Sequence, residues 1–173
     1  MSFNLETARL RLRELAPEDL DFVAEMLHDG EVMRFYPKPL DRGESQEWIE
    51  RQRRRYADHG HGLWLVEDRA TGAPVGQVGL LLQEVEGDWE PEIGYLIHRP
   101  FWRRGYASEA ALGVREHAFR VRGEKRVVSL VRPENLPSQG VARKLGMAPE
   151  REVQFRGLKH LLFAVAAVPS PGA

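Results

Sequence analysis

The sequence predicts a mixed α/β (equally, α+β) fold in which a mostly antiparallel sheet of about seven strands is flanked by about four helices. Three strand-like segments follow one another in the middle of the chain, which favours an antiparallel meander. A strand–helix–strand unit comes next, which favours a right-handed parallel crossover. The 173 residues are 42% hydrophobic and 29% charged, as in an ordinary globular protein. We expect a single domain over residues 1–168, followed by a flexible tail at residues 169–173.

Seven segments have the side-chain pattern of strands. Residues 9–13 alternate charged and apolar side chains, as a half-buried strand does. Thr71-Gly72 is a hairpin signal between two longer runs, and the two valines and the leucine of residues 126–131 are typical of a buried strand. We predict strands over residues 9–13, 63–67, 74–85, 92–98, 126–131, 151–155 and 160–168.

Four segments have helical spacing. Pro17 is typical of a first helical turn, and Asp41 and Glu44 have the spacing of a capping box. Apolar residues after Gly105 recur at i, i+3, i+4 and i+7 until Gly123 ends the pattern. We predict helices between residues 17 and 30, 41 and 60, 105 and 123, and 135 and 145.

Composition excludes several classes of function. The net charge of −1 provides no global field for holding nucleic acid, so we read the basic run at residues 51–55 as a solvated helix face. The absence of cysteine removes thiolate metal sites and a cysteine nucleophile, and we expect no metal. The longest apolar run, residues 161–168, is much shorter than the ~20 residues of a membrane span. We expect a soluble, cytoplasmic protein without a membrane partner.

The segment from Glu92 to Ala110 carries the strongest functional signal. A predicted strand leads through a short turn to Gly105 at the start of a helix, where free N–H groups and a partial positive charge attract anions. Arg103 and Arg104 add charge, which favours a phosphate or pyrophosphate site. The alternative is a plain helix start with a solvated arginine pair. The G-x-G-x-x-G and Gly-Lys-Ser/Thr patterns of dinucleotide and P-loop sites are absent.

Three runs, in order and spanning essentially the whole chain, resemble the GNAT superfamily of acyl-CoA-dependent N-acetyltransferases. Residues 101–110, FWRRGYASEA, resemble motif A, in the form Y-W-G-K-G-Y-A-T-E-A found in the Rim-type acetyltransferases of ribosomal-protein N-termini. Residues 135–147 resemble that branch's N-x-x-S-x-x-V-x-x-K-L-G-F, and residues 5–13 its L-x-T-x-R-L-x-L-R opening. Trp102 stands where the general motif has Gln or Arg.

The resemblance implies the GNAT fold, acetyl-CoA as cosubstrate, and direct transfer to a primary amine on a protein N-terminus or a small molecule. It implies a monomer or a homodimer. The CoA pyrophosphate would lie on backbone N–H groups at the start of the helix, and the pantetheine arm would pair with the strand near Ile97. Asn135 would bind the pantetheine or, alternatively, cap the following helix. The implied cofactor-binding residues are Ile97, His98, Arg99, Arg103, Arg104, Gly105, Tyr106, Ala107, Ser108 and Asn135.

The chemistry needs a base, because an alkyl ammonium with a pKa near ~10 cannot attack a thioester until it loses a proton. Glu92 is our candidate base, with Glu90 and His98 as further candidates; the alternative for Glu92 is a surface carboxylate paired with an arginine. The backbone N–H of Tyr95 is the candidate oxyanion donor. A non-catalytic acyl-CoA-binding module, sensing or regulatory, would keep the pyrophosphate turn and lack the base.

The general acid departs from the family pattern. The position that carries a tyrosine in many GNAT enzymes falls at Ala142, so Ser138 or a water must protonate the leaving thiolate. The alternative for Ser138 is a hydroxyl that bonds its own helix. The resemblance places the walls of the acceptor pocket at Phe35, Tyr36 and Trp48, for which core packing is the alternative.

Overall fold

The computed structural model describes residues 2–169. The tail expected at residues 169–173 lies outside these residues except for Pro169. The described strands are β1 (Asn4–Glu6), β2 (Leu10–Arg13), β3 (Leu63–Asp68), β4 (Pro74–Val85), β5 (Asp88–Ile97), β6 (Arg126–Val131), β7 (Ala148–Phe155) and β8 (Leu158–Ala166). The described helices are α1 (Leu20–His28), α2 (Arg42–His59), α3 (Tyr106–Arg120) and α4 (Leu136–Lys144), with short 3-10 turns at Pro17–Asp19 and Arg99–Phe101.

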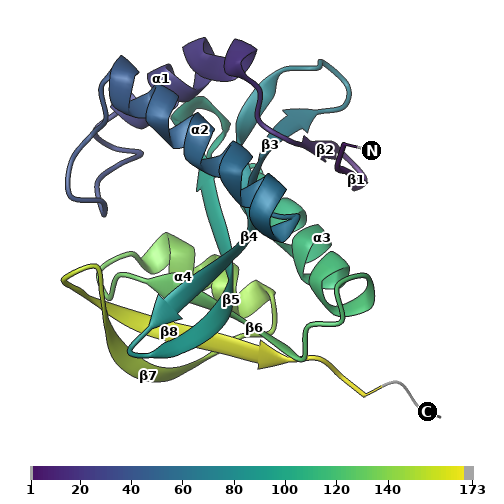
Figure 1. The fold of residues 1–173 in the computed structure, drawn as a ribbon, viewed down its shortest axis with the longest axis vertical. Helices are drawn as coiled ribbons and strands as arrows, with labels where there is room; N and C mark the ends of the chain where they lie inside the picture. The colour runs from purple at the N-terminus through teal and green to yellow at the C-terminus, as the bar shows by residue number, and fades with distance from the viewer. Residues whose placement is uncertain (1, 170–173) are drawn as a thin grey trace.

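The strands form one sheet in the order β1-β2-β3-β4-β5-β6-β8-β7 (Figure 1). Strands β3, β4 and β5 form the predicted antiparallel meander. Strands β5 and β6, which α3 connects in the sequence, form the one parallel pair of the described sheet. The mixed fold class is therefore confirmed. The sheet has eight strands instead of the expected seven or so, because β1 adds three residues along the edge of β2. A three-residue strand is too short for side-chain alternation to reveal it.

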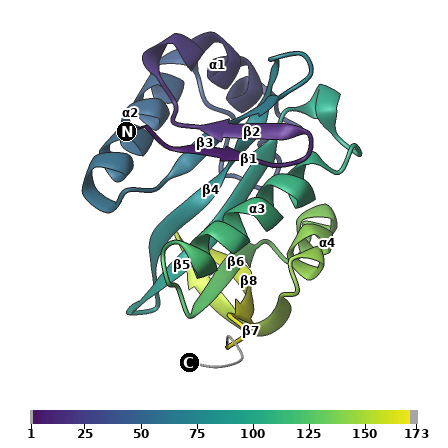
Figure 2. The same cartoon turned by 90° about the vertical axis from the view of Figure 1, so that its right-hand side faces the viewer.

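Helices cover both faces of the sheet. Helices α3 and α4 lie side by side on one face (Figure 2), where Ala110 and Val114 of α3 pack against Ile93 and Ile97 of β5. Helices α1 and α2 pack on the other face against Leu96 and neighbouring apolar side chains. Successive residues of a strand face opposite sides, so β5 contributes to both cores.

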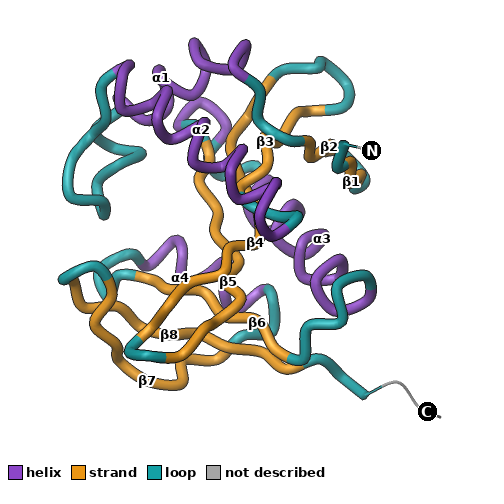
Figure 3. Tube along the Cα trace, in the orientation of Figure 1, coloured by secondary structure: helices purple, strands orange, loops and turns teal. Residues whose placement is uncertain are grey.

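Two boundaries differ from the prediction in ways that matter for the site. Strand β5 begins at Asp88, because the hairpin turn is Glu86-Gly87, with φ of 50° and 94° as a two-residue primed turn requires. Helix α1 ends at His28, which leaves a long loop before α2 (Figure 3). None of the helices in the described residues is long and apolar enough to cross a membrane.

Candidate active site

Strands β5 and β6 diverge immediately after they meet. Their parallel ladder consists of the single pair Glu92↔Val128, and just beyond it Ser129 Oγ donates to the carbonyl oxygen of Ile93 at 2.8 Å. Along a strand, the main-chain N–H and C=O groups of one residue point to the neighbouring strand on one side, and those of the next residue point to the other side. The N–H of His98 bonds to the carbonyl of Val75 in β4. The main-chain groups of Tyr95 and Ile97 therefore face the gap. An extended ligand can pair with this open edge as an added strand would.

Trp102, at the first position of motif A, holds the end of this open edge. Its indole Nε1 donates to the carbonyl oxygen of Ile97 at 2.7 Å. That contact joins the turn before α3 to the last residue of β5. A ligand that pairs here would use chiefly the N–H of Ile97 and the main-chain groups of Tyr95.

The N-terminus of α3 has free donors. Helices α2 and α4 are capped by the side chains of Asp41 and Asn135. The N-cap of α3 is Gly105, and no described side chain caps this helix. The main-chain bond that opens this helix runs from the N–H of Glu109 to the carbonyl of Gly105. The N–H groups of the preceding turn are thus available to an anion.

The turn before α3 is strained. Arg103 has a φ of 63° and Gly105 a φ of 76°, a region that costs a residue with a side chain about 1–2 kcal/mol. Such conformations persist where the surroundings impose them, and they concentrate at functional sites.

A network that local sequence patterns did not predict holds this turn in place. Arg9 of the β1–β2 turn donates through Nε to Glu109 Oε2 at 2.6 Å and through Nη1 to the carbonyl of Arg104 at 2.9 Å. The hydroxyl of Thr7 donates to Glu109 Oε1 at 2.6 Å, and the guanidinium of Arg9 lies 4.7 Å from the ring centroid of Tyr106. In the sequence, residues 5–13 and 101–110 resemble the same family, but nothing there indicates that the two segments contact each other.

Two predicted cofactor residues direct their side chains toward the α1 region instead. His98 Nε2 lies 3.5 Å from Glu25 Oε1, and Arg99 Nε lies 2.8 Å from Asp29 Oδ2. Their side chains brace the end of β5 against α1 and the loop that follows it.

The two predicted α4 residues lie at the gap. Asn135 Oδ1 accepts from the N–H of Ser138 at 3.2 Å, so the capping interpretation of Asn135 is confirmed. The hydroxyl of Tyr95 donates to the carbonyl oxygen of Ser138 at 2.7 Å and ties α4 to β5. The hydroxyl of Ser138 makes no hydrogen bond within residues 2–169. Ala142 is fully buried, so a tyrosine has no room there without repacking the core.

Glu92 lies on the opposite face of the sheet from α3, the face on which Leu96 packs against α1 and α2. It is 8% exposed, and Gln83 Nε2 of β4 donates to its Oε2 at 2.8 Å. Burial raises the pKa of Glu92 above its ordinary value, although the bonds from Gln83 and the Leu130 N–H and the positive charges of Arg156 and Arg55 oppose that shift. A carboxylate with a raised pKa beside the gap is suited to accept a proton.

Glu90, the other carboxylate considered as the base, is bound by an arginine. Glu90, two residues earlier on β5, accepts from Arg126 Nη2 at 2.8 Å and from its Nε at 3.1 Å. Its lone pairs are therefore occupied by the guanidinium.

Two of the three predicted pocket walls meet above Glu92. The rings of Tyr36 and Trp48 lie edge to face at 6.4 Å, and Trp48 Nε1 donates to Gln77 Oε1 at 2.9 Å. Tyr36 is 40% exposed as a residue, yet desolvation of its hydroxyl and the nearby charge of Glu92 raise its pKa to about 12. Phe35 is half buried, with the guanidinium of Arg34 5.7 Å from its ring centroid.

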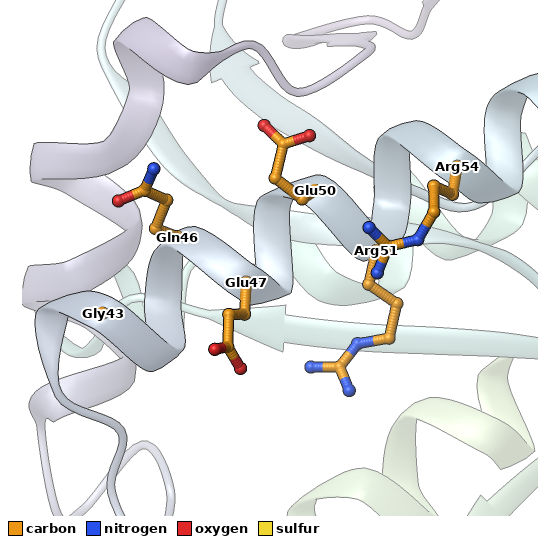
Figure 4. Close-up of a pocket in the computed structure, with 6 residues that line it drawn as sticks. All are labelled: Gly43, Gln46, Glu47, Glu50, Arg51 and Arg54. Carbon is orange, nitrogen blue, oxygen red and sulfur yellow. The ribbon is translucent and has the colours of Figure 1, made fainter.

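A surface depression of about 550 Å³ also runs along α2 (Figure 4). All of its lining residues belong to that one helix, so it is an open groove and not an enclosed cavity. Neither Glu92 nor Gln83, which donates to it, lines this groove. The residues that line it are Gly43, Gln46, Glu47, Glu50, Arg51 and Arg54.

Comparisons with known proteins agree with this geometry. A family model described as an acetyltransferase (GNAT) domain matches residues 9–148. The Bacillus subtilis protein YkkB is 35% identical over 144 residues, which cover 83% of this chain and 84% of that protein. A solved GNAT-family acetyltransferase from Bordetella pertussis has a TM-score of 0.80 at 26% identity, covering 95% of this chain and 99% of that one. RimL, a ribosomal-protein acetyltransferase solved with coenzyme A, shares the fold at 15% identity, with a TM-score of 0.78 over 95% and 98% of the two chains.

Proposed function

The chain belongs to the GNAT acetyltransferase family, as its three motifs predicted, and from that premise we propose that it transfers the acetyl group of acetyl-CoA to a primary amine. The acceptor is a protein N-terminal α-amine or a small-molecule amine, and the transfer is direct, without an acetylated enzyme. The observation that carries this proposal is the divergence of β5 and β6 at Glu92. It puts an uncapped helix start on one side of the sheet and a buried carboxylate on the other.

Acetyl-CoA fits the side of α3 and α4. Its pyrophosphate would accept bonds from the N–H groups between Arg104 and Ser108, with the side chain of Arg103 nearby in solvent. Its pantetheine would pair with the open edge of β5 at Tyr95 and Ile97 and reach past Asn135. The thioester then lies at the gap, between the two faces of the sheet.

The acceptor fits the side of α2. Glu92 takes a proton from the ammonium, directly or through a water, and the neutral amine attacks the thioester carbon. A carbon–nitrogen bond forms, and the carbonyl oxygen becomes an oxyanion that the N–H of Tyr95 stabilises. The attacking nitrogen loses its second proton to a water, the carbon–sulfur bond breaks, and Ser138, reprotonated from solvent, or a water gives a proton to the departing CoA thiolate. The walls of the acceptor pocket are formed by Phe35, Tyr36 and Trp48.

The test is release of free CoA thiol from acetyl-CoA in the presence of a panel of amines. Because the chain has no cysteine, a thiol reagent reports only the thiol of CoA. We expect release that depends on the amine, with an acetylated product of the corresponding intact mass. Tight CoA binding without release for any amine would favour the non-catalytic module instead.

A further inference from the structure

Two arginines, Arg55 and Arg156, lie near Glu92 on the acceptor side, and a third, Arg51, lies near Arg55. Arg51 and Arg55 project from successive turns of α2, and Arg156 occupies the turn between β7 and β8 with a φ of 51°. Arg51 stacks 5.6 Å from the ring centroid of Trp48, which adjoins Tyr36. Arg55 and Arg156 lie close enough to Glu92 for their charges to act on its carboxylate. The charges of Arg55 and Arg156 therefore reach Glu92 and each other, and the charge of Arg51 reaches Arg55.

These arginines lack the partners that others in the chain have. Arg53, on the same helix, pairs with Glu50 at 3.0 Å, and Arg126 pairs with Glu90 at 2.8 Å. Within residues 2–169, no carboxylate lies within the 4.0 Å of an ion pair from the guanidinium of Arg51, Arg55 or Arg156. Arg51 does project from the same side of α2 as Glu47, with Glu50 on the opposite side (Figure 4).

The arrangement costs stability, which calls for a functional reason. Arg55 is half buried and, among the partners the structure describes, donates only to the neutral Gln52 Oε1, at 3.2 Å. Desolvation and the like charges of Arg156 and Arg51 lower the pKa of Arg55, and the charge of Glu92 opposes that shift only in part. Like charges gathered beside a desolvated site are unfavourable unless an anion joins them. Guanidinium groups suit carboxylate and phosphate, which they bind through two parallel bonds.

We propose that the acceptor is a small primary amine that carries a carboxylate or a phosphate near its amino group, held by Arg55 and Arg156 with Arg51 beside them. This inference rests on the proposed function. Glu92 faces the amino group while the arginines face the anion, so the pocket matches both charges of a zwitterion. Polyamines and aminoglycosides, which carry only positive charge, are disfavoured by the same field.

The experiment compares matched pairs of acceptors that differ only in the anion. Phenylalanine is paired with phenethylamine and phosphoethanolamine with ethanolamine, with spermidine and an amidated octapeptide as further arms. We expect kcat/KM for the anionic member to exceed that of its partner by about 10- to 100-fold, the range for bonds between charged groups. The two pairs distinguish carboxylate from phosphate.

Variants then assign the preference to the arginines. Arg55→Gln and Arg156→Gln should each reduce the anionic preference about tenfold or more, mainly through KM, and Arg156→Lys should restore part of it. Arg53→Gln, from the same helix, should leave the preference unchanged. Equal use of both members, faster turnover of spermidine or the octapeptide, or an unaltered preference in both Gln variants would overturn the inference.

A binding measurement separates this result from failure of the proposed reaction. The CoA complex is titrated calorimetrically with the same pairs. Preferential binding of the anionic member that is lost in Arg156→Gln supports the inference even where no thiol is released. Equal binding of both members, or of neither, overturns it, whether or not acetyl transfer occurs with another amine.

Discussion

Replacing Glu92 by Gln tests the base directly, because the change removes the charge and keeps the shape. The glutamine carbonyl can still accept the bond from Gln83 Nε2, which lies at 2.8 Å from the carboxylate. The variant should therefore fold and bind CoA. A positioned general base contributes about 10²- to 10⁴-fold to rate, so kcat should fall by about 100-fold or more.

The pH dependence of the rate should change as well. In the wild type, activity should rise with pH as Glu92 loses its proton, through a pKa above the ordinary 4.5. The variant has no such carboxylate. Its residual rate should follow the free-base fraction of the amine alone and continue to rise toward the amine's own pKa.

Stability should move in the opposite direction to activity. Since burial raises the pKa of Glu92, the folded protein holds this proton more tightly than the unfolded chain. The stability it contributes is complete below the unfolded value near 4.5 and is lost as pH rises through the raised pKa. A tenfold difference in proton affinity between the folded and unfolded states corresponds to about 1.4 kcal/mol, or about 3–6 °C in Tm at this chain length. Glu92→Gln should therefore raise Tm at pH 8 and leave it nearly unchanged at pH 4.

The assays are steady-state thiol release between pH 5.5 and 9.5 and thermal unfolding at pH 4 and pH 8. Glu90→Gln is the matched control, because Glu90 is equally exposed, at 8%, but binds Arg126. This control should lose stability and keep the wild-type pH profile. An unchanged profile in Glu92→Gln, or a lower Tm at pH 8, would refute the reasoning about Glu92.

Three further outcomes follow from the other side of the sheet. Gly105→Glu should abolish CoA binding in calorimetry by adding bulk and negative charge at the turn, and retained affinity would contradict the site. Gly123→Glu, at a similar φ of 74° just beyond the far end of α3, should only reduce stability. Arg9→Gln should raise KM for acetyl-CoA about 5- to 50-fold with little change in kcat, because it releases the turn before α3. Arg120→Gln, at the far end of α3, should leave KM unchanged, and equal KM values for the two variants would remove Arg9 from this role. Ser138→Ala should lower kcat by less than tenfold if water substitutes as the acid, and a larger loss measured by thiol release would make the hydroxyl essential.

The sequence predicted most of the framework. Hydrophobic periodicity and turn residues located the helices and all but one strand, because burial of one face imposes a period of 2 or 3.6 on the side chains. Gly105 and the capping box at Asp41 were found because backbone geometry restricts which residues can occupy those positions. Strand β1 was missed, since three residues contain no usable period.

The site was predicted unevenly. The start of α3 and Glu92 lie in one continuous motif, so local sequence was enough to propose them. The bracing of the turn by Arg9 joins residues about 100 positions apart, and the side chains of His98 and Arg99 contact the α1 region. Pairings of this kind depend on which elements the sheet brings together.

The sequence alone determined the element order, the family resemblance and the position of the turn proposed to bind an anion, because each of these is encoded in residues that are neighbours along the chain. Only the tertiary structure decided that β5 leaves β6 at Glu92, that this carboxylate is buried, and that Arg55 and Arg156 border it. These arginines come from a helix and a hairpin turn 101 residues apart in the sequence. Their shared electrostatic field exists only once the sheet has brought the two segments close to Glu92.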